Sequence, residues 1–249
     1  MCRHLAYLGP PVPLSGLLFD PPHALCRQAW APRDMRGGGT VNVDGFGVGW
    51  YPGAGGEPVR YRRATPIWSD PSLLALAAAT ASGAILAAVR SATVGMPVTE
   101  GAAAPFAAGR WLFSHNGKVT GWPDSVAKLA ERLPVRDLLT LDAPTDSALL
   151  WALVRDRLRT GADPGDALAG TVRAVHATAP ESRLNLLLTD GERVAATTWG
   201  HALSLLDGPG SLTVSSEPLT DDPAWTEMPP RHLLVATRST LDLTPLEAA

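Results

Sequence analysis

The most reactive side chain in this 249-residue sequence belongs to Cys2, which directly follows the initiator methionine. Methionine aminopeptidase accepts a small residue after Met1, so we expect the mature chain to begin at Cys2. A free N-terminal cysteine combines a nucleophile and a base, because its α-amine has a reference pKa of about 8 and its ionised thiol is strongly nucleophilic. Such a residue can attack an amide without a separate histidine base. The alternative is a chance cysteine in a frayed terminus.

A cysteine that attacks an amide also needs hydrogen-bond donors for the developing oxyanion. Asn116 and Gly117 follow an apolar run that we expect to be a strand ending at His115. An Asn side-chain amide and a Gly backbone N–H, presented at a strand end, could form such an oxyanion hole. The alternative is a hairpin turn, since Asn-Gly is the commonest dipeptide in such turns.

Two charged residues could hold the acyl part of a substrate. Arg90 ends an apolar run, and Asp146 opens a predicted helix. A guanidinium is suited to a bidentate grip on a carboxylate, and a carboxylate accepts hydrogen bonds from an ammonium. Together they would make a receptor for an α-amino acid. Alternatively, Arg90 meets solvent at a sheet edge and Asp146 is only a helix cap.

The elements that must position these residues can be predicted from apolar patterning. Residues 45–51 alternate glycine with large apolar side chains, which predicts a strand with one bare face that another backbone or a ligand can approach. Asp190-Gly191 between two apolar runs predicts a hairpin. The expected strands are 3–8, 45–51, 85–90, 111–115, 184–188, 194–199, 212–216 and 232–237, and the expected helices are 70–82, 146–159 and one that starts at 163. This order predicts one α+β domain with two sheets packed together and helices outside them.

Composition narrows the classes of function. The net charge is −3 and the basic residues are scattered, so neither a nucleic-acid partner nor an anionic membrane surface is expected. Two cysteines do not make a disulfide framework, and no signal peptide or membrane-spanning run is evident. We therefore expect a cytoplasmic protein. The six histidines lack the spacing of zinc ligands, so neither a metal nor an organic cofactor is expected. The sequence gives no indication of the oligomeric state.

Several motifs occur in a characteristic order. They are Cys2, Asp-Gly-Phe-Gly-Val-Gly-Trp at 44–50, Arg-Ser-Ala-Thr at 90–93, His-Asn-Gly at 115–117 and Thr-Asp-Ser at 145–147. In this respect the sequence resembles the class II glutamine amidotransferases. The resemblance implies a four-layer αββα N-terminal-nucleophile hydrolase sandwich that covers residues 2–249 as a single domain.

The same resemblance implies roles for individual residues. Cys2 would be the nucleophile and its own α-amine the general base, while Asn116 and Gly117 would form the oxyanion hole. The remaining substrate-binding roles would hold a γ-glutamyl group: Arg90 its α-carboxylate, Asp146 its α-ammonium, Thr93 the same glutamate through its backbone, and His115 a supporting position near the site.

Residues 1–5, 89–97, 183–185 and 196–200 narrow the resemblance to those members that act in the ergothioneine pathway. It implies hydrolysis of a small-molecule substrate, γ-glutamyl-hercynylcysteine S-oxide, to glutamate and hercynylcysteine S-oxide through a thioester on Cys2. Two alternatives remain open. One is a generic glutaminase or γ-glutamyl amidase, and the other is a catalytically silent metabolite-binding protein with the same fold.

One segment departs from the wider family. Residues 102–106 read Ala-Ala-Ala-Pro-Phe, where many class II enzymes carry Asn-x-His-Pro. This difference puts ordinary glutaminase activity in doubt. The expected leaving group carries a trimethylammonium, which proteins usually hold with aromatic faces. Trp30, Trp68 and Trp122 lie in loop-like segments, and we expect them to be candidates for such a wall, with ordinary packing as the alternative.

Overall fold

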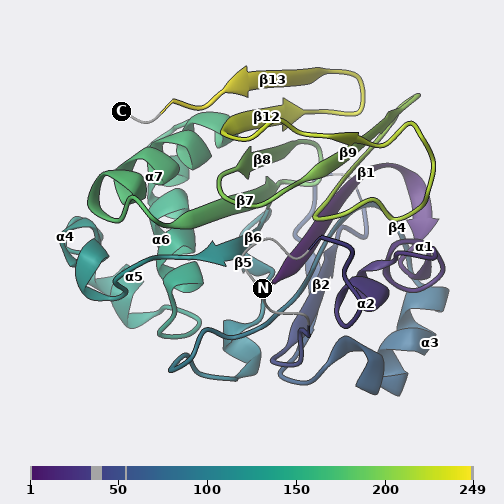
Figure 1. Ribbon diagram of the computed structural model, residues 1–249, viewed down its shortest axis with the longest axis horizontal. Helices are drawn as coiled ribbons and strands as arrows, with labels where there is room; N and C mark the ends of the chain where they lie inside the picture. Colours follow the sequence, from purple (N-terminus) through teal and green to yellow (C-terminus); the bar gives the residue numbers. More distant parts are fainter. Residues whose placement is uncertain (1, 35–40, 54, 248–249) are drawn as a thin grey trace.

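Two antiparallel sheets form the centre of the structure, a computed structural model that describes residues 2–34, 41–53 and 55–247 (Figure 1). Across the first sheet the strands are β11 (Thr226–Glu227), β9 (Ser204–Gly208), β10 (Ser211–Ser215), β1 (Arg3–Pro13), β4 (Ala81–Val89), β2 (Phe46–Trp50) and β3 (Val59–Arg63). Across the second they are β13 (Leu241–Pro245), β12 (His232–Ala236), β8 (Val194–Thr198), β7 (Arg183–Thr189), β6 (Trp111–Lys118) and β5 (Phe106–Ala108).

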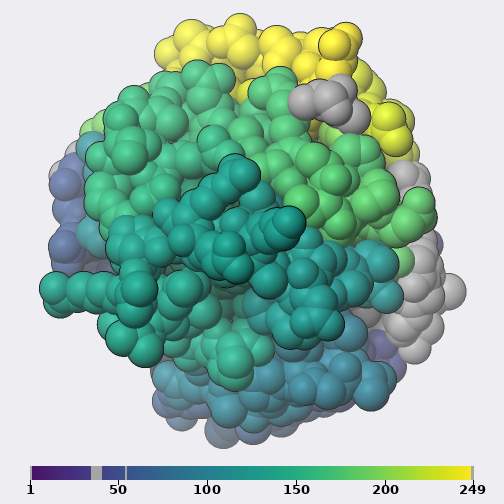
Figure 2. Space-filling view, turned by 90° about the vertical axis from the view of Figure 1, so that its left-hand side faces the viewer, coloured from purple at the N-terminus to yellow at the C-terminus, as the bar shows by residue number. Residues whose placement is uncertain are grey.

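Helices cover the outer faces of both sheets. The first sheet is covered by α1 (Ser15–Leu18), α2 (Leu25–Gln28) and α3 (Pro71–Ala79), and the second by α6 (Asp146–Arg159) and α7 (Pro164–Thr178). The shorter helical segments are α4 (Ala127–Ala130), α5 (Val135–Leu139), η1 (Ile67–Ser69), η2 (Glu100–Ala102) and η3 (Asp124–Val126). Figure 2 looks onto the side where α4–α7 form the surface. Within the described ranges, no helix combines the length and the apolar character needed to cross a bilayer.

Strand alternation explains why the sheets stack. In β1, Leu5 and Tyr7 pack under α1–α3, whereas Ala6 and Leu8 pack against the second sheet. Successive side chains of a strand point to opposite faces, so each central strand contributes to two apolar layers. Three buried clusters result, one between the sheets and one under each helical layer. The predicted four-layer αββα arrangement is confirmed.

The glycine-rich strand has the predicted bare face. A Cβ on Gly47 would lie 2.3 Å from the carbonyl oxygen of Ala104, and one on Gly49 would lie 2.6 Å from Leu112 Cδ1. Both neighbours belong to the chain around the second sheet. The missing side chains therefore allow the two sheets to approach closely at β2.

Helix starts follow their capping residues. Asp70 accepts hydrogen bonds from the backbone N–H groups of Ser72 (2.9 Å) and Leu73 (3.1 Å) at the start of α3. Helix α6 spans the predicted residues, but its N-cap is Thr145, whose hydroxyl accepts from Ala148 N at 3.2 Å. Asp146 is therefore the first helical residue and not the cap.

Several predicted boundaries were wrong. The helix expected at 70–82 ends at Ala79, and β4 already begins at Ala81. Strand β1 continues through its prolines to Pro13, with an irregularity between Leu8 and Val12. Pairing with β10 ends at Leu8, so the prolines fall where, among the described residues, one side of the strand has no paired strand. Strands β5, β9, β11 and β13 were not predicted.

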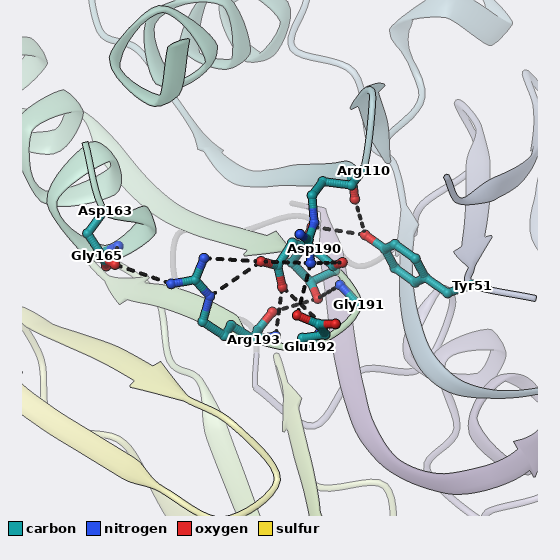
Figure 3. Close-up of polar contacts among 9 residues, drawn as sticks. Tyr51, Arg110, Asp163, Gly165, Asp190, Gly191, Glu192 and Arg193 are labelled. Carbon is teal, nitrogen blue, oxygen red and sulfur yellow. Dashed lines mark hydrogen bonds and ion pairs between the residues drawn. The ribbon is translucent and has the colours of Figure 1, made fainter. Parts of the chain in front are cut away.

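The predicted hairpin at Asp190-Gly191 is confirmed, and a buried polar cluster fixes it (Figure 3). Asp190 is 1% exposed, and its Oδ1 accepts from the backbone N–H groups of Glu192 (3.0 Å) and Arg193 (2.8 Å). Its Oδ2 forms ion pairs with Arg110 (3.5 Å) and Arg193 (3.2 Å). Burial raises the pKa of the neighbouring Tyr51 hydroxyl, with a further contribution from Asp190. This cluster connects β7 to β8 and has a structural role.

Candidate active site

Cys2 stands at the start of the central strand of the first sheet. The half-buried thiol donates a hydrogen bond to the carbonyl oxygen of Ser91, with sulfur and oxygen 3.6 Å apart. Arg3 pairs with Val89 of the neighbouring β4, so Cys2 lies beside the end of that strand, where Arg90 follows. The two residues are 88 positions apart in the sequence, and antiparallel pairing brings them together.

The Arg90 guanidinium is held by backbone carbonyls. Its Nη1 donates to Pro97 O (2.9 Å) and, over a longer distance, to Asp44 O (3.4 Å). The Asp44 carboxylate itself accepts from Ala92 N (2.7 Å) and so fixes the loop after Arg90. Within the described residues, no carboxylate forms an ion pair with Arg90. A fixed cation without a carboxylate partner is suited to binding a substrate carboxylate.

Asn116 lies inside β6 and not after a strand end, which corrects the sequence-based prediction. It pairs with Asn185 of β7, and the register continues to Lys118 and Arg183, so the alternative of an Asn-Gly hairpin turn is excluded. The side chain is fully buried, and Nδ2 donates to Ser216 Oγ over a long 3.5 Å. An amide nitrogen carries two hydrogens, so a second donor is available for a substrate oxygen.

Gly117 is required by the same strand pairing. A Cβ at this position would lie 1.9 Å from Arg183 O and 2.7 Å from His115 Nε2. Non-bonded atoms do not approach a Cβ this closely, so no side chain fits at Gly117 without displacing β7.

Asp146 connects α6 to the end of β6. Its Oδ2 accepts from Val119 N (2.9 Å), and its Oδ1 accepts from Ser147 N (2.8 Å). The side chain is 7% exposed. An ionised carboxylate offers about four acceptor positions, so two contacts fix its orientation and leave capacity for a substrate ammonium.

His115 points from β6 toward α6. Its Nε2 lies 2.9 Å from Arg183 O and its Nδ1 lies 2.9 Å from Ser147 Oγ. A carbonyl only accepts, so we assign the hydrogen to Nε2, and neutral Nδ1 then accepts from Ser147. Burial lowers the pKa of His115, which favours this neutral form, although Asp146 acts in the opposite direction. Both nitrogens are occupied, which fits a supporting role.

A small cavity of about 20 Å³ lies beside the Cys2 thiol. Its lining residues are Cys2, Ala88, Val89, Arg90, Ala102, Ala104, Phe106, His115 and Ser147. This volume holds about one water molecule, so the cavity is the inner end of a site and not a complete substrate pocket. Ala102 and Ala104 come from the segment that departs from the wider family, and both line the same cavity as Cys2.

Of the predicted residues, Cys2, Arg90 and His115 line this cavity, whereas Asn116, Gly117, Asp146 and the remaining ones do not. Thr93 is exposed on the loop after Arg90, and its carbonyl accepts from Met96 N (2.9 Å). Trp68 belongs to η1 near the helical layer of the first sheet, whereas Trp122 packs with the cluster under α6 and α7. The Arg27 guanidinium lies over the Trp30 ring, with its Cζ 3.9 Å from the ring centroid. Because Trp68 and Trp122 lie on opposite outer layers, the prediction of one common aromatic wall was wrong.

Two residues at the site were missed by the sequence analysis. Ser147 contacts both His115 and Asp146, and its position directly after Asp146 was an available indication. Ser216 contacts Asn116 and, through its hydroxyl, His4 N at 3.0 Å. Nothing in the spacing of the sequence indicated Ser216, because the contact depends on the pairing of β1 with β10.

Comparison with known sequences identifies the family of this chain. A model of the family Glutamine amidotransferases class-II matches residues 13–207. The chain belongs to this family. Relatives named gamma-glutamyl-hercynylcysteine sulfoxide hydrolase are 41% identical in Mycolicibacterium smegmatis (99% of this chain, 100% of the relative) and 42% identical in Mycobacterium tuberculosis (100% and 98%).

A solved structure agrees with this assignment. The glutamine aminotransferase class-II domain protein of Silicibacter pomeroyi is 26% identical, with a TM-score of 0.70 over 99% of this chain and 100% of that protein. The fold of this chain is thus that of the class II glutamine amidotransferases.

Proposed function

We propose that this protein hydrolyses the γ-glutamyl amide bond of γ-glutamyl-hercynylcysteine S-oxide. The observation that carries the proposal is the full-length identity of 41–42% to relatives with that named activity. Cys2, Arg90 and His115 line one cavity, and Asp146 directly precedes Ser147 of the same lining, which supports it. The products would be glutamate and hercynylcysteine S-oxide, and the reaction consumes one small γ-glutamyl compound and one water molecule.

The first chemical step is attack on the γ-carbonyl. The Cys2 α-amine takes the thiol proton, and the thiolate adds to the carbonyl carbon to form a tetrahedral oxyanion. Asn116 Nδ2 and the Gly117 backbone N–H stabilise this oxyanion, and removal of one such donor typically costs about 10²–10³ in kcat. This step needs Met1 to be removed, and Met1 lies outside the described residues.

The second step releases the amine and then glutamate. The protonated α-amine of Cys2 delivers its proton to the departing nitrogen, which leaves a γ-glutamyl thioester on sulfur. A water molecule then cleaves the thioester and regenerates Cys2. Throughout, Arg90 holds the α-carboxylate of the glutamyl group and Asp146 its α-ammonium, with Thr93 contributing through its backbone. His115 accepts from the Ser147 hydroxyl and so holds that side chain beside Asp146.

The alternative is a glutaminase, and one observation disfavours it. Ala102 and Ala104 place small apolar side chains at the inner cavity where many class II enzymes have a polar motif.

A catalytic thiol suits the reducing cytoplasm, and both cysteines are free. We therefore propose that the reaction takes place in the cytoplasm.

The proposal is tested by glutamate release. Purified protein is incubated with γ-glutamyl-hercynylcysteine S-oxide or with glutamine, and a Cys2→Ala variant serves as control. We expect kcat/KM for the S-oxide to exceed that for glutamine by at least tenfold, with no turnover by Cys2→Ala. Equal or faster use of glutamine would support the glutaminase alternative, and undiminished turnover by Cys2→Ala would refute the mechanism.

A further inference from the structure

The strands beside β1 give Cys2 two different flanks. On one side β4 carries Arg90, which is proposed to bind the glutamyl end of the substrate. On the other side β10 pairs with β1, and β9 and β11 follow outward. Since Arg90 fixes the glutamyl group on the β4 side, the β10 side is available for the half of the substrate that departs.

A cavity of about 440 Å³ lies on this β10 side. Residues that matter in its lining are Arg33, Ser216, Glu217, Asp222, Trp225 and Glu227. The volume is within the range of about 300–1,000 Å³ that is typical of small-molecule sites. The cavity beside the thiol, at about 20 Å³, is far too small for a leaving group that carries an imidazole ring.

Ser216 joins this cavity to the candidate oxyanion hole. Its side chain is buried, and its hydroxyl lies 3.5 Å from Asn116 Nδ2 and 3.2 Å from His4 O. Asn116 belongs to the second sheet, so Ser216 spans the gap between the sheets next to the start of β1. The inner wall of the cavity is therefore in direct contact with a residue that we place at the reacting carbonyl.

The outer wall has the chemistry of a cation site. Trp225 is half-buried, and its indole orientation is fixed by a hydrogen bond from Nε1 to Thr220 Oγ1 (3.1 Å). Asp222 is exposed, and its Oδ1 accepts from Ala224 N (2.8 Å), which leaves Oδ2 available. Within the described residues, no cationic side chain forms an ion pair with Asp222. By contrast, Asp221 is already paired with Arg33 (2.7 Å).

A quaternary ammonium has no N–H to donate, so proteins hold it with aromatic faces and nearby negative charge. We propose that the cavity formed by the loop after β10, by Arg33 and by residues of β9 and β11 binds the leaving half of the substrate, with its trimethylammonium against Trp225 and Asp222. This inference rests on the proposed function and names a different aromatic residue from the three that the sequence suggested.

The test compares substrates that differ at the leaving group. Trp225→Phe and Asp222→Asn are assayed with γ-glutamyl-hercynylcysteine S-oxide, its desmethyl analogue and γ-glutamyl methylamide. We expect Trp225→Phe to lower the ratio of kcat/KM for the trimethylated substrate over the desmethyl one by about threefold to tenfold, in line with a cation–π contact. Asp222→Asn should lower the ratio of kcat/KM for γ-glutamyl-hercynylcysteine S-oxide to kcat/KM for γ-glutamyl methylamide. Trp68→Phe and Asp242→Asn, both remote from the cavity, should keep wild-type ratios.

A binding measurement separates the assignment of this cavity from the proposed hydrolase activity. Calorimetry with hercynine, the trimethylated histidine, is carried out on the Cys2→Ala protein and on its combination with Trp225→Phe. Weaker binding in the combined variant supports the cavity assignment. Unchanged ratios and unchanged hercynine affinity would overturn it while leaving the hydrolase proposal intact, provided that the wild type releases glutamate from the S-oxide. Absence of that release would instead contradict the hydrolase proposal itself.

Discussion

At the scale of single residues, the site is defined by hydrogen-bonding capacity that the protein does not use. Arg90 has carbonyl partners but no carboxylate partner among the described residues, and Asp146 has its two oxygens oriented by backbone N–H groups. Asn116 is fully buried, and among the described residues its Nδ2 donates only to Ser216 Oγ, over 3.5 Å, so its second hydrogen is unused. Unused capacity at buried or half-buried polar groups is costly unless a ligand fills it.

Replacement of Arg90 should weaken recognition of the glutamyl carboxylate. A charge-assisted hydrogen bond contributes about 1.5–3 kcal/mol, so Arg90→Gln should lower kcat/KM by about 10- to 100-fold, mainly through KM. Arg90→Lys retains the charge and should recover part of the loss. Arg238→Gln, beside the cavity at the far end of β4, is the matched control and should behave as wild type. Steady-state kinetics measure all three, and an unchanged KM in Arg90→Gln would remove Arg90 from the site.

At the scale of elements, strand pairing decides what the residues at the site can do. The sequence predicted the span of α6, the bare face of β2 and the hairpin at Asp190-Gly191, because each depends on local preferences or on simple alternation. The Asn116-Gly117 dipeptide was placed after a strand for the same local reason. In the fold, β7 pairs across it and extends the strand to Lys118. Tertiary pairing therefore overrode the local turn preference.

Gly117 gives a direct test of this pairing. Gly117→Ala would place a Cβ 1.9 Å from Arg183 O, so β6 and β7 must separate locally. We expect the free energy of unfolding to fall by about 1–3 kcal/mol, as is typical of an overpacked site. Gly16→Ala in α1 meets no atom within 4 Å and should be neutral or slightly stabilising. Urea unfolding of both variants provides the measurement, and equal midpoints would show that β6 and β7 are not paired as described.

At the scale of the whole molecule, buried histidines lie between and beside the two sheets. Burial lowers the pKa of His201 to about 3, with Arg183 and Arg3 adding to the effect. Burial also lowers the pKa of His4 well below its usual value, and the neighbouring His115 contributes. These groups stay neutral in the folded protein at pH values where an unfolded chain, with a histidine pKa of about 6.5, is protonated.

This difference predicts a stability change with pH. The unfolded state binds more protons below about pH 6.5, so the free energy of unfolding should fall as the pH is lowered from about 6.5 to 4.5 and stay level just above that range. Each such histidine contributes at most about 1.4 kcal/mol per pH unit. Urea unfolding across this range measures the slope, and His201→Asn should reduce it. The account is contradicted by a flat profile or by an unchanged slope in His201→Asn.

The global arrangement of layers could be predicted from the sequence. The residues on the β10 side of Cys2 could not. Alternating strands and two long helices predict two sheets with helices outside, which the structure confirms. Ser216 and Trp225 become part of the site only because β10 pairs with β1 and β9 follows β10. The pairing of β1 with β10 joins residues as far apart in sequence as Leu5 and Ser215, and no local pattern marks it.

The proposed mechanism requires the Cys2 sulfur to form a covalent bond with the γ-carbonyl carbon of a glutamyl group. The most direct measurement is labelling with the glutamine-like electrophile diazo-oxo-norleucine, followed by peptide mapping. Cys26 is an internal control, because it is also half-buried and burial raises the pKa of its thiol, which lowers its thiolate fraction. The account predicts a single adduct on an N-terminal peptide that begins at Cys2. An adduct on Cys26, or a labelled peptide that still carries Met1, would contradict it.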